Sequence, residues 1–200
     1  LVEHPQERPQ RNPMTTATPA PPKPTDYPAR GAPPSDEERA RRAAVRETQE
    51  ETGLVIDAAD LETLSCWTPP PGIALRIRTW FFAARAPVGE LTLSANEAVA
   101  SVWQRPADAL ARHARGELTL YPPTWVTLHS MADQSPVDAV LAEIRLGGVQ
   151  RFDTVSGRTD SGPMLLWQDD AQYDPDAATD APARHRIEIG RLPWVYTCTR

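Results

Sequence analysis

The arrangement of apolar and polar positions predicts short strands separated by helices. Residues 73–79 alternate between apolar or small side chains and the arginines Arg76 and Arg78, which is the period of a strand with two different faces. We therefore expect a strand over residues 74–84. Extended chain is expected to begin at residues 54–56, and weaker alternating patterns predict further strands at residues 98–103, 164–167, 184–189 and 194–198.

Capping residues and helix-forming composition predict the helices. Ser35 and Glu38 have the spacing of a capping box, and the run to Thr52 is rich in Ala, Arg and Glu. Gly53 suits the left-handed turn that ends a helix, so we expect this helix to lie between Ser35 and Gly53. Helices are also predicted at residues 106–114, at 122–132 and from 135 onward, the last with a capping pattern. Helices interspersed with strands predict a mixed α and β fold.

Residues 1–34 differ in composition from the rest of the chain. Ten of the 22 prolines fall there, and Thr15–Pro24 is a low-complexity tract of Pro, Thr and Ala. Such a segment cannot bury enough apolar surface to offset its loss of conformational entropy. We expect residues 1–34 to be disordered and a folded domain to occupy residues 35–200. The alternative is a proline-rich ligand for a partner, centred on Pro21–Pro24.

Composition and charge exclude several classes of protein. The chain of 200 residues has a formal net charge of −6, which argues against a nucleic-acid binder and against docking on an anionic membrane. The longest apolar run, Trp80–Ala84, is far too short to span a bilayer, and no signal peptide is visible. Cys66 and Cys198 lack metal-ligand spacing and are expected to be partly buried thiols. We therefore expect a cytoplasmic protein; the Ala- and Arg-rich composition is typical of GC-rich bacterial genomes.

Three carboxylates are expected on one stripe of the first helix. Glu47, Glu50 and Glu51 are three and four residues apart, so they project within an arc of about 100°. Like charges at this spacing repel one another, and a hard divalent cation such as Mg²⁺ removes the repulsion. Arg46 can pair with a carboxylate and fix its orientation. The alternative is a solvated, charge-rich helix face.

The string Arg46-Glu47-x-x-Glu50-Glu51-x-Gly53-Leu54 closely resembles the Nudix box, G-x5-E-x7-R-E-U-x-E-E-x-G-U, in which U is aliphatic. In that family the box is a loop–helix–loop that binds Mg²⁺ or Mn²⁺ and the diphosphate of a nucleoside diphosphate derivative. The resemblance implies that Glu47, Glu50 and Glu51 are metal ligands and that Arg46 orients them.

The match has one ambiguous position and two departures. Glu38 stands where the box has its first glutamate, and a metal-site role and the capping role are equally open for it. Ala32 occupies the position of the box glycine, with Gly31 one place early, and Thr48 replaces an aliphatic residue. Neither departure removes a metal ligand.

Weaker similarities continue after the box. Glu97, Trp103, Pro106 and Leu110 resemble the E-x5-W-x-x-P-x-x-L stretch that follows the box in many Nudix domains. The family often draws a further ligand or general base from this region, so Glu97 is a candidate catalytic residue beside Glu50 and Arg46. Residues 76–82, 116–118 and 122–124 resemble a bacterial branch that is similar to the peroxisomal coenzyme A diphosphatases. Arg76 and Arg78 either contact phosphate or face solvent, and Arg184–Arg186 is expected to be an exposed strand face.

The resemblance implies an α/β (α+β) fold with a mixed sheet sandwiched by helices. The strands that normally precede the box are missing or altered, because residues 1–34 show no alternating apolar pattern. Three explanations are open: a wrong start or reading frame, a decayed copy, or completion of the sheet by a partner strand or subunit. A homodimer is compatible with the last.

Two functions are therefore carried forward. The first is Mg²⁺- or Mn²⁺-dependent hydrolysis of a small-molecule diphosphate, in which water attacks phosphorus and Glu50 or Glu97 is the general base. Coenzyme A or acyl-coenzyme A is the substrate class that the branch implies. The second is a non-catalytic or decayed Nudix-fold module that binds a nucleotide or a protein. The box itself identifies only the shared diphosphate.

Overall fold

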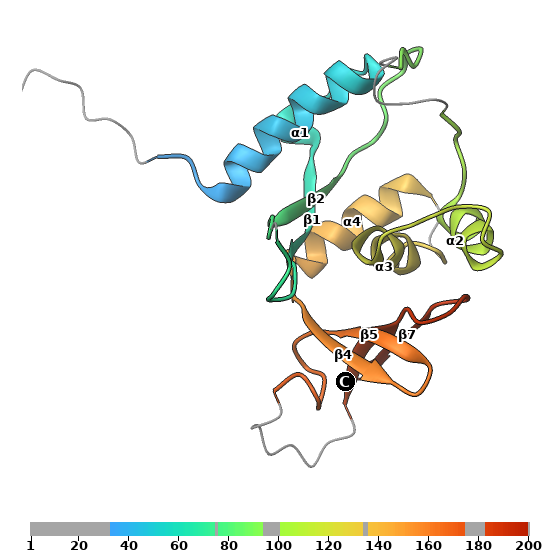
Figure 1. Ribbon diagram of the computed structural model, residues 1–200. Helices are drawn as coiled ribbons and strands as arrows, with labels where there is room; N and C mark the ends of the chain where they lie inside the picture. The colour runs from blue at the N-terminus through green and yellow to red at the C-terminus, as the bar shows by residue number, and fades with distance from the viewer. Residues whose placement is uncertain (1–32, 75, 94–100, 134–135, 175–182, 200) are drawn as a thin grey trace, which may run out of the picture. The chain divides into compact units, whose positions relative to one another are not determined.

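The architecture consists of two β-sheets with α-helices packed against them (Figure 1). The computed structural model describes residues 33–74, 76–93, 101–133, 136–174 and 183–199. The helices in this part are α1 (Asp36–Thr52), α2 (Pro106–Ala114), α3 (Pro122–Ser130) and α4 (Val137–Gly147), with a short 3-10 helix, η2 (Ala58–Asp60). The strands are β1 (Glu62–Thr68), β2 (Thr79–Ala83), β3 (Gln150–Asp153), β4 (Val155–Thr159), β5 (Gly162–Leu166), β6 (Arg184–Glu188) and β7 (Val195–Thr199).

The first sheet is mixed and has β1 at its centre. Its order is β2-β1-β3, with β2 antiparallel and β3 parallel to β1. Helix α1 packs against β2, and α4 packs against β1. The predicted Nudix-like mixed sheet with packed helices is therefore confirmed.

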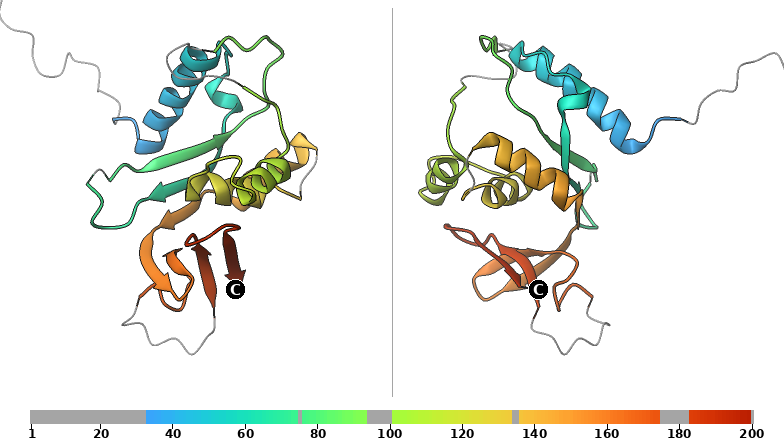
Figure 2. Two further views of the ribbon diagram at one scale, coloured as in Figure 1. Left: turned by 45° about the vertical axis from the view of Figure 1, so that its right-hand side comes forward. Right: turned by 180° about the vertical axis from the view of Figure 1, so that it is seen from behind.

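The second sheet is an antiparallel meander in the order β4-β5-β6-β7. The chain passes into it directly from the first sheet, because β4 begins two residues after β3 ends. At the junction, the backbone N–H of Thr154 donates to the carbonyl oxygen of Thr68 at 3.0 Å. In both views of Figure 2, α2, α3 and α4 lie between α1 and the second sheet.

An aromatic cluster forms the core and joins the two sheets. Trp67 of β1 stacks face to face on Phe152 of β3, with ring centroids 3.7 Å apart and planes at 3°. Trp167 meets the edge of this pair, 5.5 Å from Trp67 and 5.4 Å from Phe152. Trp125 and Val126 of α3 and Ile187 of β6 complete the buried cluster. Residues 67 and 187 therefore belong to one core although they lie in different sheets.

The predicted helices are present, with two changes. Helix α1 has the expected capping box at Ser35 and the left-handed Gly53 at its end, and α2 spans the predicted residues 106–114. Helix α3 ends at Ser130, two residues earlier than predicted. Helix α4 begins after Pro136, and Ser135, on which the predicted capping pattern depends, lies outside the described residues. None of the described helices is long and apolar enough to cross a membrane.

The strand predictions are correct at the C-terminal end and partly wrong elsewhere. β5, β6 and β7 lie where strands were predicted, but β2 begins only at Thr79. Before it, the chain loops back, Arg76 Nε donates to the carbonyl oxygen of Pro69 at 2.8 Å, and Ile73 and Ile77 are exposed. Residues 101–103 form no strand, residues 98–100 lie outside the described residues, and β1, β3 and β4 were not predicted.

Two expectations about surface exposure were also wrong. Cys66 is buried, but Cys198 is exposed. Arg186, which was expected on an exposed strand face, is buried and forms a bidentate ion pair with Asp170. Asp170 also accepts hydrogen bonds from the backbone N–H groups of Gln172 and His185, each at 2.9 Å. The second sheet therefore holds a fully hydrogen-bonded buried carboxylate.

This ion pair makes stability depend on pH. Burial alone would raise the pKa of Asp170, but the hydrogen bonds from Arg186, Gln172 and His185 outweigh it and hold the pKa below its ordinary value. Since the folded pKa is depressed, the stabilisation is complete above the unfolded pKa, about 3.9, and is lost as the pH falls through the folded value. We expect Asp170→Asn to lower the free energy of unfolding at pH 7 by about 3 kcal/mol, because it leaves a buried charge unpaired.

Urea denaturation between pH 3 and pH 7 measures both effects. Asp170→Asn should flatten the acid loss of stability, whereas Asp160→Asn, at an exposed carboxylate, should leave the curve unchanged. An Asp170→Asn protein as stable as the wild type at pH 7 would contradict the assigned role of the pair.

Candidate functional site

Helix α1 carries the candidate glutamates and begins with a complete capping box. The Ser35 hydroxyl accepts the backbone N–H of Glu38 at 3.2 Å, and the Glu38 carboxylate accepts the backbone N–H of Ser35 at 2.6 Å. This second hydrogen bond holds the pKa of Glu38 below its ordinary value. Of the two roles left open for Glu38, the structure shows the capping role.

The side of α1 that faces the sheet is half-buried and largely polar or small. None of its residues is fully buried, and the half-buried residues of the helix are Glu37, Ala40, Arg41, Ala43, Ala44, Val45, Thr48 and Thr52. With about 100° per residue, Glu51 lies about 60° from Thr48 around the helix axis, and Glu47 about 100°. Glu51 and Glu47 therefore lie beside the face that packs on the sheet, whereas Glu50, about 160° from Thr48, lies on the outer side of the helix.

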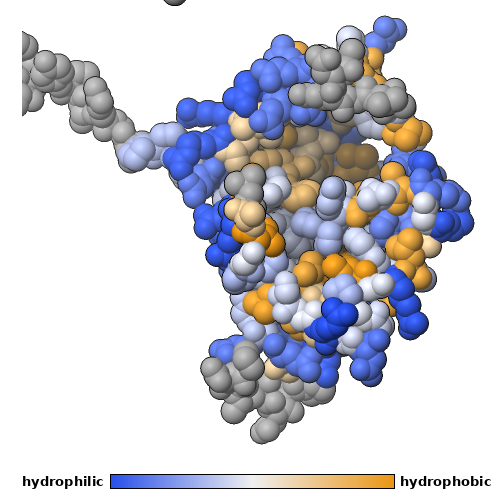
Figure 3. Space-filling model, viewed as in Figure 1, coloured by the Kyte–Doolittle hydropathy of each residue, from blue (hydrophilic) through white to orange (hydrophobic). Residues whose placement is uncertain are grey.

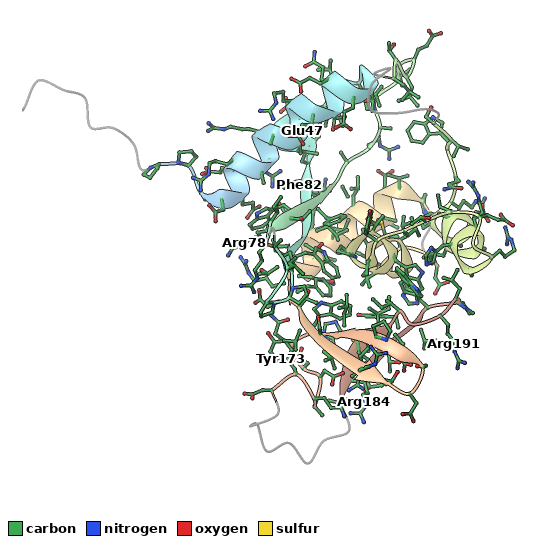
Figure 4. The ribbon with its side chains drawn as sticks, in the orientation of Figure 1. Glu47, Arg78, Phe82, Tyr173, Arg184 and Arg191 are labelled. Carbon is green, nitrogen blue, oxygen red and sulfur yellow. The ribbon has the colours of Figure 1, made fainter. Side chains whose placement is uncertain are left out.

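Arg46 links two of the three glutamates. Its Nη2 lies 3.0 Å from Oε1 of Glu47, and its Nε lies 3.7 Å from Oε1 of Glu50. All three side chains are more than half exposed, at 61% for Arg46, 55% for Glu47 and 63% for Glu50. Figure 4 labels Glu47 on α1, and Figure 3 shows the surface of this helix as mainly hydrophilic, beside a hollow with hydrophobic residues.

The glutamate side chains do not converge on a common point. Within the part of the chain that the structure describes, no three His, Cys, Asp or Glu side chains are grouped closely enough to hold a metal ion. Glu51 is exposed, as Glu47 and Glu50 are. Carboxylates at this helical spacing repel one another, and a divalent cation bound between them would remove the repulsion.

The C-terminal end of α1 is held by a glycine turn and by a segment that follows β2. Gly53 adopts φ +72°, and its N–H donates to the carbonyl oxygen of Gln49 at 2.9 Å. The backbone N–H of Thr92 then donates to the carbonyl oxygen of Thr52 at 2.9 Å. Glu97, five residues after Thr92, lies outside the described residues, and its catalytic role stays a prediction.

Arg76 and Arg78, the two arginines predicted either to contact phosphate or to face solvent, are exposed and bind other groups of the protein. Arg78 Nη1 lies 3.1 Å from Oδ2 of Asp36 at the start of α1, and Arg76 donates to the carbonyl oxygen of Pro69. A cavity of about 400 Å³ opens between residues 55–60, residues 85–88 and α4. It begins at Val55, four residues after Glu51, and its lining is mixed: apolar residues such as Ile56, Pro87 and Leu141 stand beside the charged residues Asp57, Asp60, Arg85, Asp138 and Arg145.

The sequence analysis did not identify Arg41 as a residue that attaches α1 to the sheet. Arg41 reaches η2 and β1, whereas its neighbours Arg39 and Arg42 are exposed. Its spacing of four from Glu37 was a signal for an ion pair, but the spacing alone does not say which arginine turns toward the sheet.

The turn at Gly53 is strictly limited to glycine. A Cβ there would lie 3.2 Å from Cβ of Thr92, on a backbone with positive φ. We expect Gly53→Ala to lower the free energy of unfolding by about 1 to 2 kcal/mol, because a left-handed residue other than glycine is strained. At Gly147, the last residue of α4, a Cβ would meet nothing within 4 Å, so Gly147→Ala should be neutral or stabilising. Chemical denaturation of the two variants compares them; equal effects would contradict the argument.

The comparisons with known proteins agree with the predicted family. A family model described as NUDIX domain matches residues 10–123, which is more than half of the chain and includes all of α1. No curated protein and no solved structure matches the chain significantly. On the strength of the family model, this chain belongs to the NUDIX family.

Proposed function

We propose that the protein hydrolyses the diphosphate linkage of a nucleoside diphosphate derivative in a reaction that depends on Mg²⁺ or Mn²⁺. One observation carries the proposal: Arg46, Glu47, Glu50 and Glu51 share one flank of a capped helix inside the NUDIX match. The family supports a small-molecule substrate with a diphosphate, and the acidic flank supports the metal.

The donor set fits a hard divalent cation. Glu47, Glu50 and Glu51 would supply carboxylate oxygens, which Mg²⁺ and Mn²⁺ prefer, and an exposed helix flank leaves room for water and phosphate ligands. When bound, the cation would neutralise diphosphate charge and lower the pKa of a coordinated water. Arg46 would hold Glu47 and Glu50 in place by the contacts it already makes.

Two glutamates are candidates for the general base that takes the proton of the attacking water. Glu50 belongs to the box and lies 3.7 Å from Nε of Arg46. Glu97 belongs to the stretch after the box, and the Thr92–Thr52 hydrogen bond supports it, because five residues span at most about 17 Å. That reach is enough to return to the last turns of α1.

For the substrate, we propose coenzyme A or acyl-coenzyme A within the broader class. Its support is the similarity of residues 76–82, 116–118 and 122–124 to the coenzyme A diphosphatase branch. The cavity of about 400 Å³ that begins at Val55, with apolar and charged side chains in its lining, is compatible with a substrate that carries a sizeable group besides its diphosphate.

A non-catalytic NUDIX module that binds a nucleotide or a protein is the second candidate. The observation that favours it is the separation of the three carboxylates, which form no group able to hold a metal among the described residues. A module of this kind would bind its ligand without turnover.

Hydrolysis of a substrate panel tests the proposal directly. We expect turnover with Mg²⁺ of at least one of coenzyme A, acyl-coenzyme A, NADH, ADP-ribose, a nucleoside triphosphate and a diadenosine polyphosphate, resolved by chromatography. Glu51→Gln should reduce kcat/KM by more than about 100-fold, since it removes a charged ligand. Asp133→Asn, an exposed carboxylate after α3, is the matched control and should retain activity. Metal binding by a folded protein without any turnover would favour the module instead.

The role of Glu38 gives a separate test. In Glu38→Gln the amide oxygen can still accept the backbone N–H of Ser35, so the cap is retained while the charge is lost. If Glu38 only caps α1, this variant should bind Mn²⁺ within about twofold of the wild type, whereas Glu51→Gln should lose affinity by tenfold or more. Titration of Mn²⁺ by electron paramagnetic resonance compares them, and an equal loss in both variants would assign Glu38 to the metal.

A further inference from the structure

Arg41 makes the most extensive set of contacts between α1 and the sheet. Its Nη1 donates to the carbonyl oxygens of Ala58, at 3.1 Å, and of Leu61. Its Nη2 donates to the hydroxyl of Thr63 at 2.6 Å. One guanidinium therefore binds the 3-10 helix η2, Leu61 that follows it, and Thr63, the second residue of β1.

The same guanidinium is held from two further directions. Thr63 Oγ1 donates onward to Oε1 of Glu37 at 2.6 Å, and that oxygen lies 3.4 Å from Arg41 Nη2. The Arg41 Cζ lies 5.2 Å from the ring centroid of Phe82 on β2, which Figure 4 labels beside α1. Arg41, Glu37 and Thr63 form a closed network that is only 25% and 34% exposed at its two charged side chains.

This network matters because α1 has no buried apolar residue to fix its rotation. Arg41 points at the sheet, so the helical period places Glu51 about 80°, Glu47 about 120° and Glu50 about 180° from it. A rotation of 30° about the axis would move a carboxylate on a helix of roughly 5.5 Å outer radius by about 3 Å. Metal–ligand distances tolerate only about 0.2 Å.

We propose that Arg41 is the positioning residue of the glutamate site: by binding η2, β1 and β2 at once, it fixes the rotation of α1 and so the direction of Glu47, Glu50 and Glu51. This inference rests on the proposed function, because it assumes that the three glutamates bind a divalent cation. Arg41 itself is not a metal ligand and does not contact the reacting atoms. Its planar fork is required, since one ammonium group cannot reach Ala58, Leu61 and Thr63 together.

The direction of the expected effect separates positioning from simple electrostatics. Removing a positive charge near a cation site should by Coulomb's law strengthen cation binding. If Arg41 positions the glutamates, its removal weakens binding instead. Arg42 is the matched control, because it is the next residue of the same helix, carries the same charge and is exposed.

The experiment measures Mn²⁺ affinity by electron paramagnetic resonance for the full chain and for Arg41→Met, Arg41→Lys, Thr63→Val and Arg42→Met. Circular dichroism first establishes a temperature at which every variant is folded. We expect Arg41→Met and Arg41→Lys to lose affinity by about tenfold or more and Arg42→Met to keep or gain affinity. Thr63→Val should show a smaller loss, and the double variant Arg41→Met/Thr63→Val should lose less affinity than the two single losses combined, because the two residues belong to one network.

Each other outcome has a defined meaning. A folded wild type that binds no Mn²⁺ overturns the proposed function and this inference with it. A wild type that binds Mn²⁺, with Arg41→Met equal to it or with Arg42→Met equally weakened, overturns the inference and leaves the proposed function standing. Amide hydrogen exchange across residues 58–63 gives the second readout, and unchanged protection in Arg41→Met would also overturn the inference.

Discussion

Strand β1 is the element on which both halves of the structure depend. At its start, Arg41 of α1 donates to the carbonyl oxygen of Leu61, the residue before the strand, and to the hydroxyl of Thr63 within it. At its end Trp67 stacks on Phe152, where the chain passes from the first sheet into the second. The glutamate helix and the aromatic core are therefore fixed to opposite ends of a single seven-residue strand. A disturbance of β1 reaches the candidate site and the core together.

The sequence predicted α1 well and β1 not at all, for a physical reason. The ends of α1 are set by local hydrogen bonds, at Ser35 and at Gly53, and local signals are legible in sequence. β1 reads Glu-Thr-Leu-Ser-Cys-Trp-Thr and buries four consecutive residues, so it lacks the alternation of a half-exposed strand. Ser65 can be buried because its hydroxyl accepts the indole N–H of Trp67, a pairing that only the folded chain reveals.

The candidate site also has a part that the sequence predicts and a part that it does not. Helical spacing alone places Glu47, Glu50 and Glu51 on one flank, and the structure keeps that arrangement with Arg46 between two of them. The anchor of the helix could not be predicted, because Arg41 binds backbone carbonyl oxygens of η2 and β1, and any residue type supplies those. The strand predicted over residues 74–84 begins only at Thr79, since the chain turns at Pro71 and Gly72 and Arg76 binds the carbonyl oxygen of Pro69; residue 75 lies outside the described residues.

The NUDIX match ends at residue 123, but the core that the matched region packs into includes residues beyond it. Trp67 lies inside the match and packs against Phe152 and Trp167, which lie beyond it. The buried ion pair between Asp170 and Arg186 joins the loop after Trp167 to β6 of the second sheet, where Arg186 pairs with Leu166 of β5. Helix α1 adds no buried side chain, and of the six buried residues in the cluster around Trp67, five follow residue 123: Trp125, Val126, Phe152, Trp167 and Ile187. The four-stranded sheet therefore contributes to the core that holds β1, to which the glutamate helix is attached, although it supplies none of the predicted metal ligands.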